Sequence, residues 1–237
     1  MFENDLAMFK LQLKVALKDR LFFFYTLVIP IIMALLNRGE YFQDNDALYI
    51  YWAYIVVTTV LNGFLMKIIQ LREDGFLKTL FYLTGSKLSI IMSSFLVQLV
   101  VVQLEILSFN LLVMLLITPV SLTTFIYGFL GSFLATLLCT AMLSGLLLLR
   151  IRQGLFNTLI VIFLLGGIIL LGIRPTGYWN YLLTVLNPFQ LIYGLYLVPG
   201  TSNVFGILIG FCIVGYLLLG FLVFHNISVK SQLNRVK

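Results

Sequence analysis

Apolar residues occupy six long stretches of the chain, and short polar segments separate them. The apolar stretches cover residues 21–36, 48–71, 87–117, 121–149, 154–172 and 203–224. A helix needs about 20 consecutive apolar residues to cross the hydrocarbon core of a bilayer. The third and fourth stretches exceed that length, which helix tilt accommodates. The pattern therefore predicts an all-α, polytopic membrane protein with six transmembrane helices in a single transmembrane domain, residues 1–237.

The segment before the first apolar stretch has the pattern of an amphipathic helix. Four apolar residues recur at helical spacing: Leu6, Phe9, Leu13 and Leu17. A second stripe repeats lysine every four residues, at Lys10, Lys14 and Lys18. A helix of this kind lies in the headgroup layer with its lysines reaching anionic lipid. The sequence thus predicts an interfacial helix within residues 1–20. The lysines also fit an ordinary topology signal, and the two interpretations are compatible.

The composition supports a membrane environment for most of the chain. Hydrophobic residues make up 61% and charged residues 10% of the sequence, and the mean hydropathy is +1.08. A soluble domain has roughly 25% charged residues, so a large soluble domain is excluded. Cys139 and Cys212 fall within apolar stretches and are expected to be small core residues, not a disulfide or a metal pair. His225 ends the last stretch, where a helix-end role is expected.

The distribution of basic residues predicts the orientation. With six spans, 13 of the 15 lysines and arginines fall on one side of the membrane, and only Arg38 and Arg174 fall on the other. Basic residues accumulate on the cytoplasmic side of membrane proteins. Both termini and the segment 71–86 are therefore expected in the cytoplasm. This topology accounts for the net charge of +6, and no nucleic-acid partner is expected.

The segment between the second and third spans, LREDGFLKTLFYLTGSKLS (residues 71–89), concentrates charges in a chain that has few of them. A short helix-forming sequence runs from Phe76 to Leu83 between Gly75 and Gly85, and glycine permits sharp reversals. The apolar face of this sequence consists of Phe76, Leu77, Leu80 and Phe81. Two interpretations stay open from these residues alone. One is a short helix that docks on a cytoplasmic partner, and the other is a solvated turn with topology-setting charges.

The third span contains Gln98, Gln103 and Glu105, with Asn110 beyond them. Gln98 and Glu105 are seven residues apart and share one face of the helix, and Gln103 lies between them in sequence. Polar and ionisable residues inside a membrane are costly, and they usually face a cavity or a partner. Glu105 is therefore a candidate for binding a cationic part of a substrate, with Gln98 and Gln103 on the same pathway. Such residues also hold helix bundles together, so a structural role for Glu105 stays equally open.

Three stretches resemble the type-2 ATP-binding-cassette (ABC) exporter permeases. The first, REDGFLKTLFYLTGSKLSIIMSSFL, is similar to the family's acidic pair, coupling helix and next span, with Phe76 where threonine is commoner. The second, LKVALKDRLFFFYTLVIPIIMALL, resembles the family's opening interfacial helix and first span. The third, LLTVLNPFQLIYGLY, matches a common pattern at Leu186, Asn187 and Pro188. The three stretches lie between residues 13 and 196, in the family's order and at its spacing.

The resemblance implies a set of partners and contact residues. Such a permease pairs with a second permease subunit, identical or different, and with two cytoplasmic ABC ATPase subunits that bind ATP and Mg. Residues 72–86 would be the cytoplasmic coupling helix, and its contacts with the ATPase would be Glu73, Asp74, Gly75, Phe76, Lys78 and Leu80. Residues 173–202 would form an extracellular, re-entrant gate with its break at Asn187, Pro188 and Phe189.

These observations lead to one expected function and one alternative. The expected function is that of a permease subunit of an ABC exporter, which moves an apolar or amphipathic substrate (a peptide, drug or lipid-like molecule) out of the cell. The chain has no GxxxxGK[ST] phosphate loop. ATP hydrolysis is therefore expected on the partner, and this chain is expected to be neither an enzyme nor a binder of cofactor or metal. The alternative is an ion-coupled carrier or channel that uses Glu105 without ATP. Both place the chain in the cell membrane, of the bacterial inner-membrane type, in contact with lipid.

Overall fold

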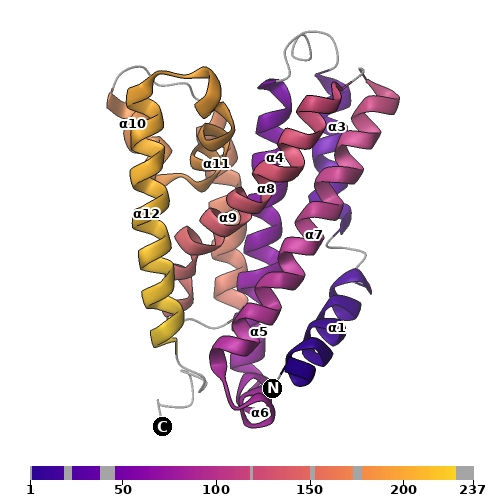
Figure 1. Ribbon diagram of the computed structural model, residues 1–237, viewed down its shortest axis with the longest axis vertical. Helices are drawn as coiled ribbons and strands as arrows, with labels where there is room; N and C mark the ends of the chain where they lie inside the picture. The colour runs from indigo at the N-terminus through magenta and orange to yellow at the C-terminus, as the bar shows by residue number, and fades with distance from the viewer. Residues whose placement is uncertain are drawn as a thin grey trace.

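The computed structural model is all-α and describes residues 2–18, 23–37, 46–117, 120–149, 153–172 and 178–227. Figure 1 shows an elongated bundle in which most long helices run close to the longest axis. Within the described residues, five helices are long and apolar enough to cross a membrane: Ala47–Glu73, Lys87–Leu116, Leu122–Leu148, Gln153–Leu170 and Asn203–Asn226. The chain is thus a multi-pass membrane protein, and these five spans agree closely with the predicted second to sixth apolar stretches.

The first predicted span is shorter than expected in the described part of the chain. It comprises a π-helical turn, η1 (Phe24–Val28), followed by α3 (Ile29–Leu36). Its apolar helix runs from Tyr25 to Leu36, which is below the length of a full span. Pro30 is tolerated because it lies at the beginning of α3, where its missing N–H costs little.

The second span is one continuous rod with a π-helical turn in its middle. It consists of α4 (Asp46–Thr59), η2 (Val60–Leu65) and α5 (Met66–Glu73). A π-helical turn inserts an extra residue into the helix and shifts the faces of the helix on either side of it. The first π-helical turn, η1, contains Thr26, and the second, η2, follows Thr59; both threonines contact the third span, as described below.

Helix α7 (Lys87–Leu116) follows a short helix, α6 (Phe76–Thr84), which lies at one end of the bundle. Helix α1 (Phe2–Lys18) is packed along the half of α7 that is nearer this end (Figure 1). The last long helix, α12 (Asn203–Asn226), also ends here, and Lys87 Nζ donates a hydrogen bond to the carbonyl of His225. Because α6 lies at this end of the bundle (Figure 1), we call it the α6 end. The first and last described helices reach the same end, and both chain termini are predicted to be cytoplasmic.

The fourth span enters the membrane from the opposite end. Helix α8 (Leu122–Leu143) begins at a capping residue, Ser121, whose hydroxyl accepts the Thr124 N–H at 3.0 Å. It continues into a 3₁₀ turn, η3 (Ser144–Leu148), and α9 (Gln153–Gly172) follows. Helices α8 and α12 approach so closely that a Cβ on Gly220 would lie 2.9 Å from Ala141 Cα. Small residues at this contact allow the two helices to approach closely.

Two short helices form a sharp corner at the end of the molecule opposite α6. Helix α10 (Tyr178–Leu186) and the pair α11 (Pro188–Leu197) and η4 (Val198–Gly200) meet at 111°, the geometry of a broken span or a re-entrant loop. The break falls at Asn187 and Pro188, where the sequence analysis places it. Figure 1 shows this corner beside the beginning of α12. Residues 173–177 of the predicted gate lie outside the described residues.

An aromatic cluster holds α4, α8 and α11 together. Its members, whose ring centroids are 5.2–6.0 Å apart, are Tyr49, Trp52, Tyr127 and Tyr196. Trp52 Nε1 donates to Asn110 Oδ1 of α7 at 2.8 Å, and the Tyr127 hydroxyl donates to the Tyr196 carbonyl at 2.8 Å. Aromatic rings bury large apolar areas, and their polar atoms need partners inside a bundle. The cluster therefore joins the corner helix α11 to the spans.

Candidate functional site

Helix α6 is bounded by two glycines in the left-handed conformation. Gly75 has φ +73° and Gly85 has φ +71°, and they are the glycines with positive φ within the described residues. Residues with a Cβ rarely adopt this conformation because of steric conflict with the backbone. The two reversals set α6 across the ends of α5 and α7 instead of continuing either helix. The short helix predicted within residues 72–86 is thus present, and glycine is the reason for both of its boundaries.

The inner face of α6 is used inside the chain. Leu77 and Leu80 form a small core with Ile90 of α7 and Met8 of α1. Leu80 is only 8% exposed. Leu80 therefore packs against the chain's own bundle, where burial stabilises an apolar residue. Its contact with a partner ATPase stays a prediction.

The outer face of α6 is exposed and mixed in character. Its exposed side chains are Phe76, Lys78, Thr79 and Tyr82. The Lys78 ammonium lies 5.8 Å from the centroid of the Tyr82 ring, within the range of a cation–π contact. Asp74 is also exposed, just before the helix. Four of the expected contact residues (Asp74, Gly75, Phe76 and Lys78) are therefore at or near the surface, and Tyr82 joins them.

Arg72 connects the root of α6 to the neighbouring span. Its side chain is completely buried, and Nη1 donates to the carbonyl of Leu147 at 2.8 Å. Nη2 lies 3.4 Å from the carbonyl of Leu149, and Nε pairs with Glu73 Oε1 at 3.2 Å. The carbonyls at the end of a helix have no partner within the helix, and a planar guanidinium provides several donors. Arg72 thus caps the end of η3, and its ion pair orients Glu73, which lies three residues before α6.

Sequence analysis did not single out Arg72. In the sequence it resembles any basic residue that sets topology at a membrane boundary. The only distinguishing signal is its position, next to Glu73 and at the end of a long apolar run. Its role depends on carbonyls 75 and 77 residues away, and no local pattern encodes that contact.

Glu105 lies at the meeting point of three spans. One carboxylate oxygen accepts the Thr26 hydroxyl at 2.5 Å, and the other accepts the Thr59 hydroxyl at 2.6 Å. Thr26 belongs to η1, and Thr59 is the residue that precedes η2. The Glu105 side chain has no exposed surface. In this structure the carboxylate therefore joins the first, second and third spans, which is the structural role that the sequence analysis left open.

The three polar residues of α7 lie in different surroundings. Gln98 donates from Nε2 to the carbonyl of Thr59 at 2.9 Å and lines a cavity beside α1. Gln103 is buried, and neither of its amide atoms has a partner within the described residues. Glu105 is enclosed as described above. The structure thus brings Gln98 and Glu105 together through Thr59, and it gives Gln98 alone of the three a place on that cavity.

The residues expected at the external break are packed against α9. Asn187 Nδ2 donates to the carbonyl of Gly167 at 3.1 Å, and Asn187 Oδ1 accepts the Phe189 N–H at 3.1 Å. The Phe189 ring lies over Gly167, where a Cβ would come within 2.5 Å of it. Pro188 begins α11, a position that suits its fixed φ. Asn187 therefore caps α11 and also joins the corner to the fifth span.

The comparisons with known proteins add no family to this description. No protein-family model matches the chain, and no curated protein matches it. Across the part of the chain that the structure describes, no group of three or more His, Cys, Asp or Glu side chains is placed to hold a metal ion.

Proposed function

We propose that this chain is the membrane-spanning permease subunit of an exporter driven by a separate ABC ATPase. The observation that carries the proposal is α6: a short helix set across the α6 end by Gly75 and Gly85, with an exposed outer face. Peptide and helix recognition by a partner uses such a face. ATP and Mg would be bound by the partner, and the face that meets it would include Phe76, Lys78 and Tyr82.

The attachment of α6 supports a mechanical role. Leu77 and Leu80 pack on α1 and α7. Arg72 donates hydrogen bonds to two carbonyls at the end of η3, the turn that continues α8. A displacement of α6 by the partner would thus reach several spans at once, because packed cores transmit movement and do not deform continuously. Glu73 forms an ion pair with Arg72. Its proposed contribution is therefore to stabilise the connection between α5 and α6 as well as to contact the partner.

The rest of the proposal concerns the pathway and the second subunit. Helices α9 and α12 bury the smallest share of their spans inside the chain, which leaves them open to lipid or to a second permease subunit. The α10–α11 corner with Asn187, Pro188 and Phe189 would close the pathway at the external end. The substrate would be apolar or amphipathic. Of the three α7 residues predicted on the pathway, Gln98 borders the cavity beside α1, whereas Glu105 is engaged with Thr26 and Thr59.

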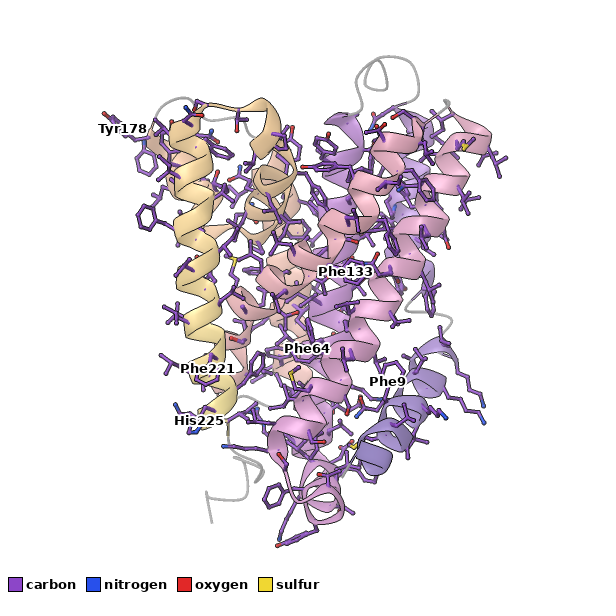
Figure 2. All side chains as sticks on the ribbon, viewed as in Figure 1. Phe9, Phe64, Phe133, Tyr178, Phe221 and His225 are labelled. Carbon is purple, nitrogen blue, oxygen red and sulfur yellow. The ribbon has the colours of Figure 1, made fainter. Side chains whose placement is uncertain are left out.

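Co-purification tests the proposal. The full chain is purified in mild detergent together with the cytoplasmic ATPase encoded beside it. Tyr82→Ala removes a 74% exposed ring from α6, and Tyr178→Ala removes a 91% exposed ring from the opposite end of the molecule (Figure 2). We expect Tyr82→Ala to reduce the ATPase retained about tenfold, as for an aromatic contact residue at a protein interface. Tyr178→Ala should retain as much ATPase as the unsubstituted chain.

Two results would count against the proposal. The first is that no cytoplasmic ATPase is retained by the unsubstituted chain, in which case α6 has no such partner. The second is equal retention by both tyrosine variants, which would place the contact elsewhere. The alternative, an ion-coupled carrier, predicts instead that Glu105→Gln abolishes ion flux in proteoliposomes. An ion-coupled carrier would require a path from solvent to the Glu105 carboxyl group, which has no exposed surface in this structure.

A further inference from the structure

A cavity of about 200 Å³ with polar and apolar lining residues lies between α1, the η2–α5 part of the second span and α7. Its polar lining residues are Gln12, Asn62, Lys67, Gln70, Ser94 and Gln98. No acidic residue of the described chain is among the lining residues. A buried polar group without a hydrogen-bond partner is costly. Its place beside the interfacial helix α1, near the α6 end, is the reason to ask what occupies it.

The cavity has unused hydrogen-bond donors on one side. The Gln12 Nε2 atom is enclosed and has no partner within the described residues. Lys67 makes no ion pair with any described residue, and its ammonium offers three donors. Gln12 comes from α1 and Lys67 from α5, so the two donors approach the cavity from different helices. An anion between them would satisfy both.

The other side of the cavity offers acceptors. Asn62 donates from Nδ2 to the Thr58 carbonyl at 3.2 Å, and Gln98 donates from Nε2 to the Thr59 carbonyl at 2.9 Å. An amide that donates through its nitrogen keeps an oxygen that can accept a hydrogen bond. Gly63 makes this arrangement possible, because a Cβ at that position would overlap the Gln98 amide. The cavity therefore suits an anionic ligand that also carries hydroxyl donors.

We propose that this cavity binds the headgroup of an anionic phospholipid that carries hydroxyl groups, such as phosphatidylglycerol. The phosphate contacts Lys67 and Gln12, and the hydroxyls donate to Asn62 and Gln98. The volume suits a headgroup, so the acyl chains lie outside along the bilayer. Exposed apolar residues of α1, including Leu11 and Val15, are available to contact the acyl chains. The proposal is independent of the partner ATPase.

Lipid retention by the purified full chain tests this proposal. The chain in mild detergent is titrated with phosphatidylglycerol or phosphatidylcholine, and bound lipid is counted by native mass spectrometry. Lys67→Gln removes the charge in the cavity. Its control, Lys14→Gln, removes the same charge from an exposed position on α1. We expect Lys67→Gln to weaken phosphatidylglycerol binding about fivefold, the usual effect of one basic residue near an anionic surface, and Lys14→Gln to leave it unchanged.

Two further variants separate recognition from folding. Gln12→Leu removes the enclosed donor at similar size and should also weaken binding, whereas Lys67→Arg keeps the charge and should retain it. The unfolding temperature without added lipid shows whether each variant is folded. Lipid binding is compared only between folded variants.

The outcomes are distinct. Preferential retention of phosphatidylglycerol, lost in Lys67→Gln and kept in Lys14→Gln, supports the proposal. Equal retention of the two lipids would overturn it, as would equal effects of the two lysine variants. The last experiment adds inorganic phosphate as a competitor. If millimolar phosphate binds alone and fully displaces the lipid, the cavity is a site for a free anion, and the lipid proposal is wrong.

Discussion

Glu105 shows how one side chain can join elements that are distant in sequence. Its two oxygens accept hydroxyls from Thr26 and Thr59, and Thr59 also accepts Gln98 through its carbonyl. Hydrogen bonds between helices within a membrane contribute about 0.6 kcal/mol on average and up to about 2 kcal/mol. We therefore expect this cluster to matter mainly for the stability of the bundle.

Thr59→Val should reveal this contribution, because valine keeps the branched shape and removes the hydroxyl that Glu105 accepts. We expect a loss of about 1–2 kcal/mol in the free energy of unfolding, measured by denaturant titration in detergent. The control is Thr158→Val on α9, where an exposed hydroxyl donates only to the Gly154 carbonyl of its own helix. That change should stay within about 0.5 kcal/mol. Equal losses would mean that Glu105 does not join the spans through Thr59.

At the scale of elements, α6 depends on backbone conformation as much as on packing. Neither Gly75 nor Gly85 has any atom within 4 Å of an added Cβ, so space does not require glycine at either position. The positive φ requires glycine at both positions, because a Cβ in this conformation conflicts with the adjacent backbone. The exact direction of α6 therefore follows from two residues that make no side-chain contact of their own.

Gly75→Ala and Gly85→Ala should each cost about 1–2 kcal/mol in the free energy of unfolding. The matched control is Gly166→Ala within α9, which also has open space around the added Cβ and has no positive φ. Alanine favours a helix over glycine by up to about 1 kcal/mol, so this variant should be neutral or more stable. Thermal unfolding of the three variants checks the contrast. A loss at Gly166 that matches the loss at Gly75 would contradict the backbone explanation.

At the scale of the whole molecule, the two ends of the bundle differ. The α6 end carries α1, α6 and the end of α12, and the opposite end carries the α10–α11 corner (Figure 1). Figure 2 shows His225 near the first end and Tyr178 at the second. The count of basic residues predicts that the α6 end is cytoplasmic. The external position of the α10–α11 corner follows from the same count.

Cysteine labelling tests this orientation. Both native cysteines, Cys139 and Cys212, are buried, and Cys139→Ala with Cys212→Ala provides a background without thiols. In that background, Tyr178→Cys should react with a membrane-impermeant maleimide in intact cells. Tyr82→Cys should react only after permeabilisation, because α6 is predicted to face the cytoplasm. The reverse pattern would invert the topology, and labelling of both positions from one side would refute the placement of α6 and α10 at opposite ends.

Several features could be predicted from the sequence because they depend on neighbouring residues. The lengths of the apolar stretches predicted the spans, the two glycines predicted the limits of α6, and Asn187 with Pro188 predicted the break before α11. The apolar face of α6 was also predicted, but its direction was not. A short amphipathic helix has one apolar side, and either a partner or the chain's own bundle satisfies it. The structure places Leu80 against the bundle.

The sequence by itself determined that the chain is a multi-pass helical membrane protein, because crossing a bilayer imposes length and apolarity on each local segment. Only the tertiary structure decided which polar groups meet. Glu105 finds Thr26 and Thr59 across separations of 79 and 46 residues, and Arg72 finds a carbonyl 75 residues away. Such contacts depend on which helices lie side by side and on their rotation about their axes. A π-helical turn contains Thr26 and another follows Thr59; such turns shift the faces of a helix, and no local pattern predicted them.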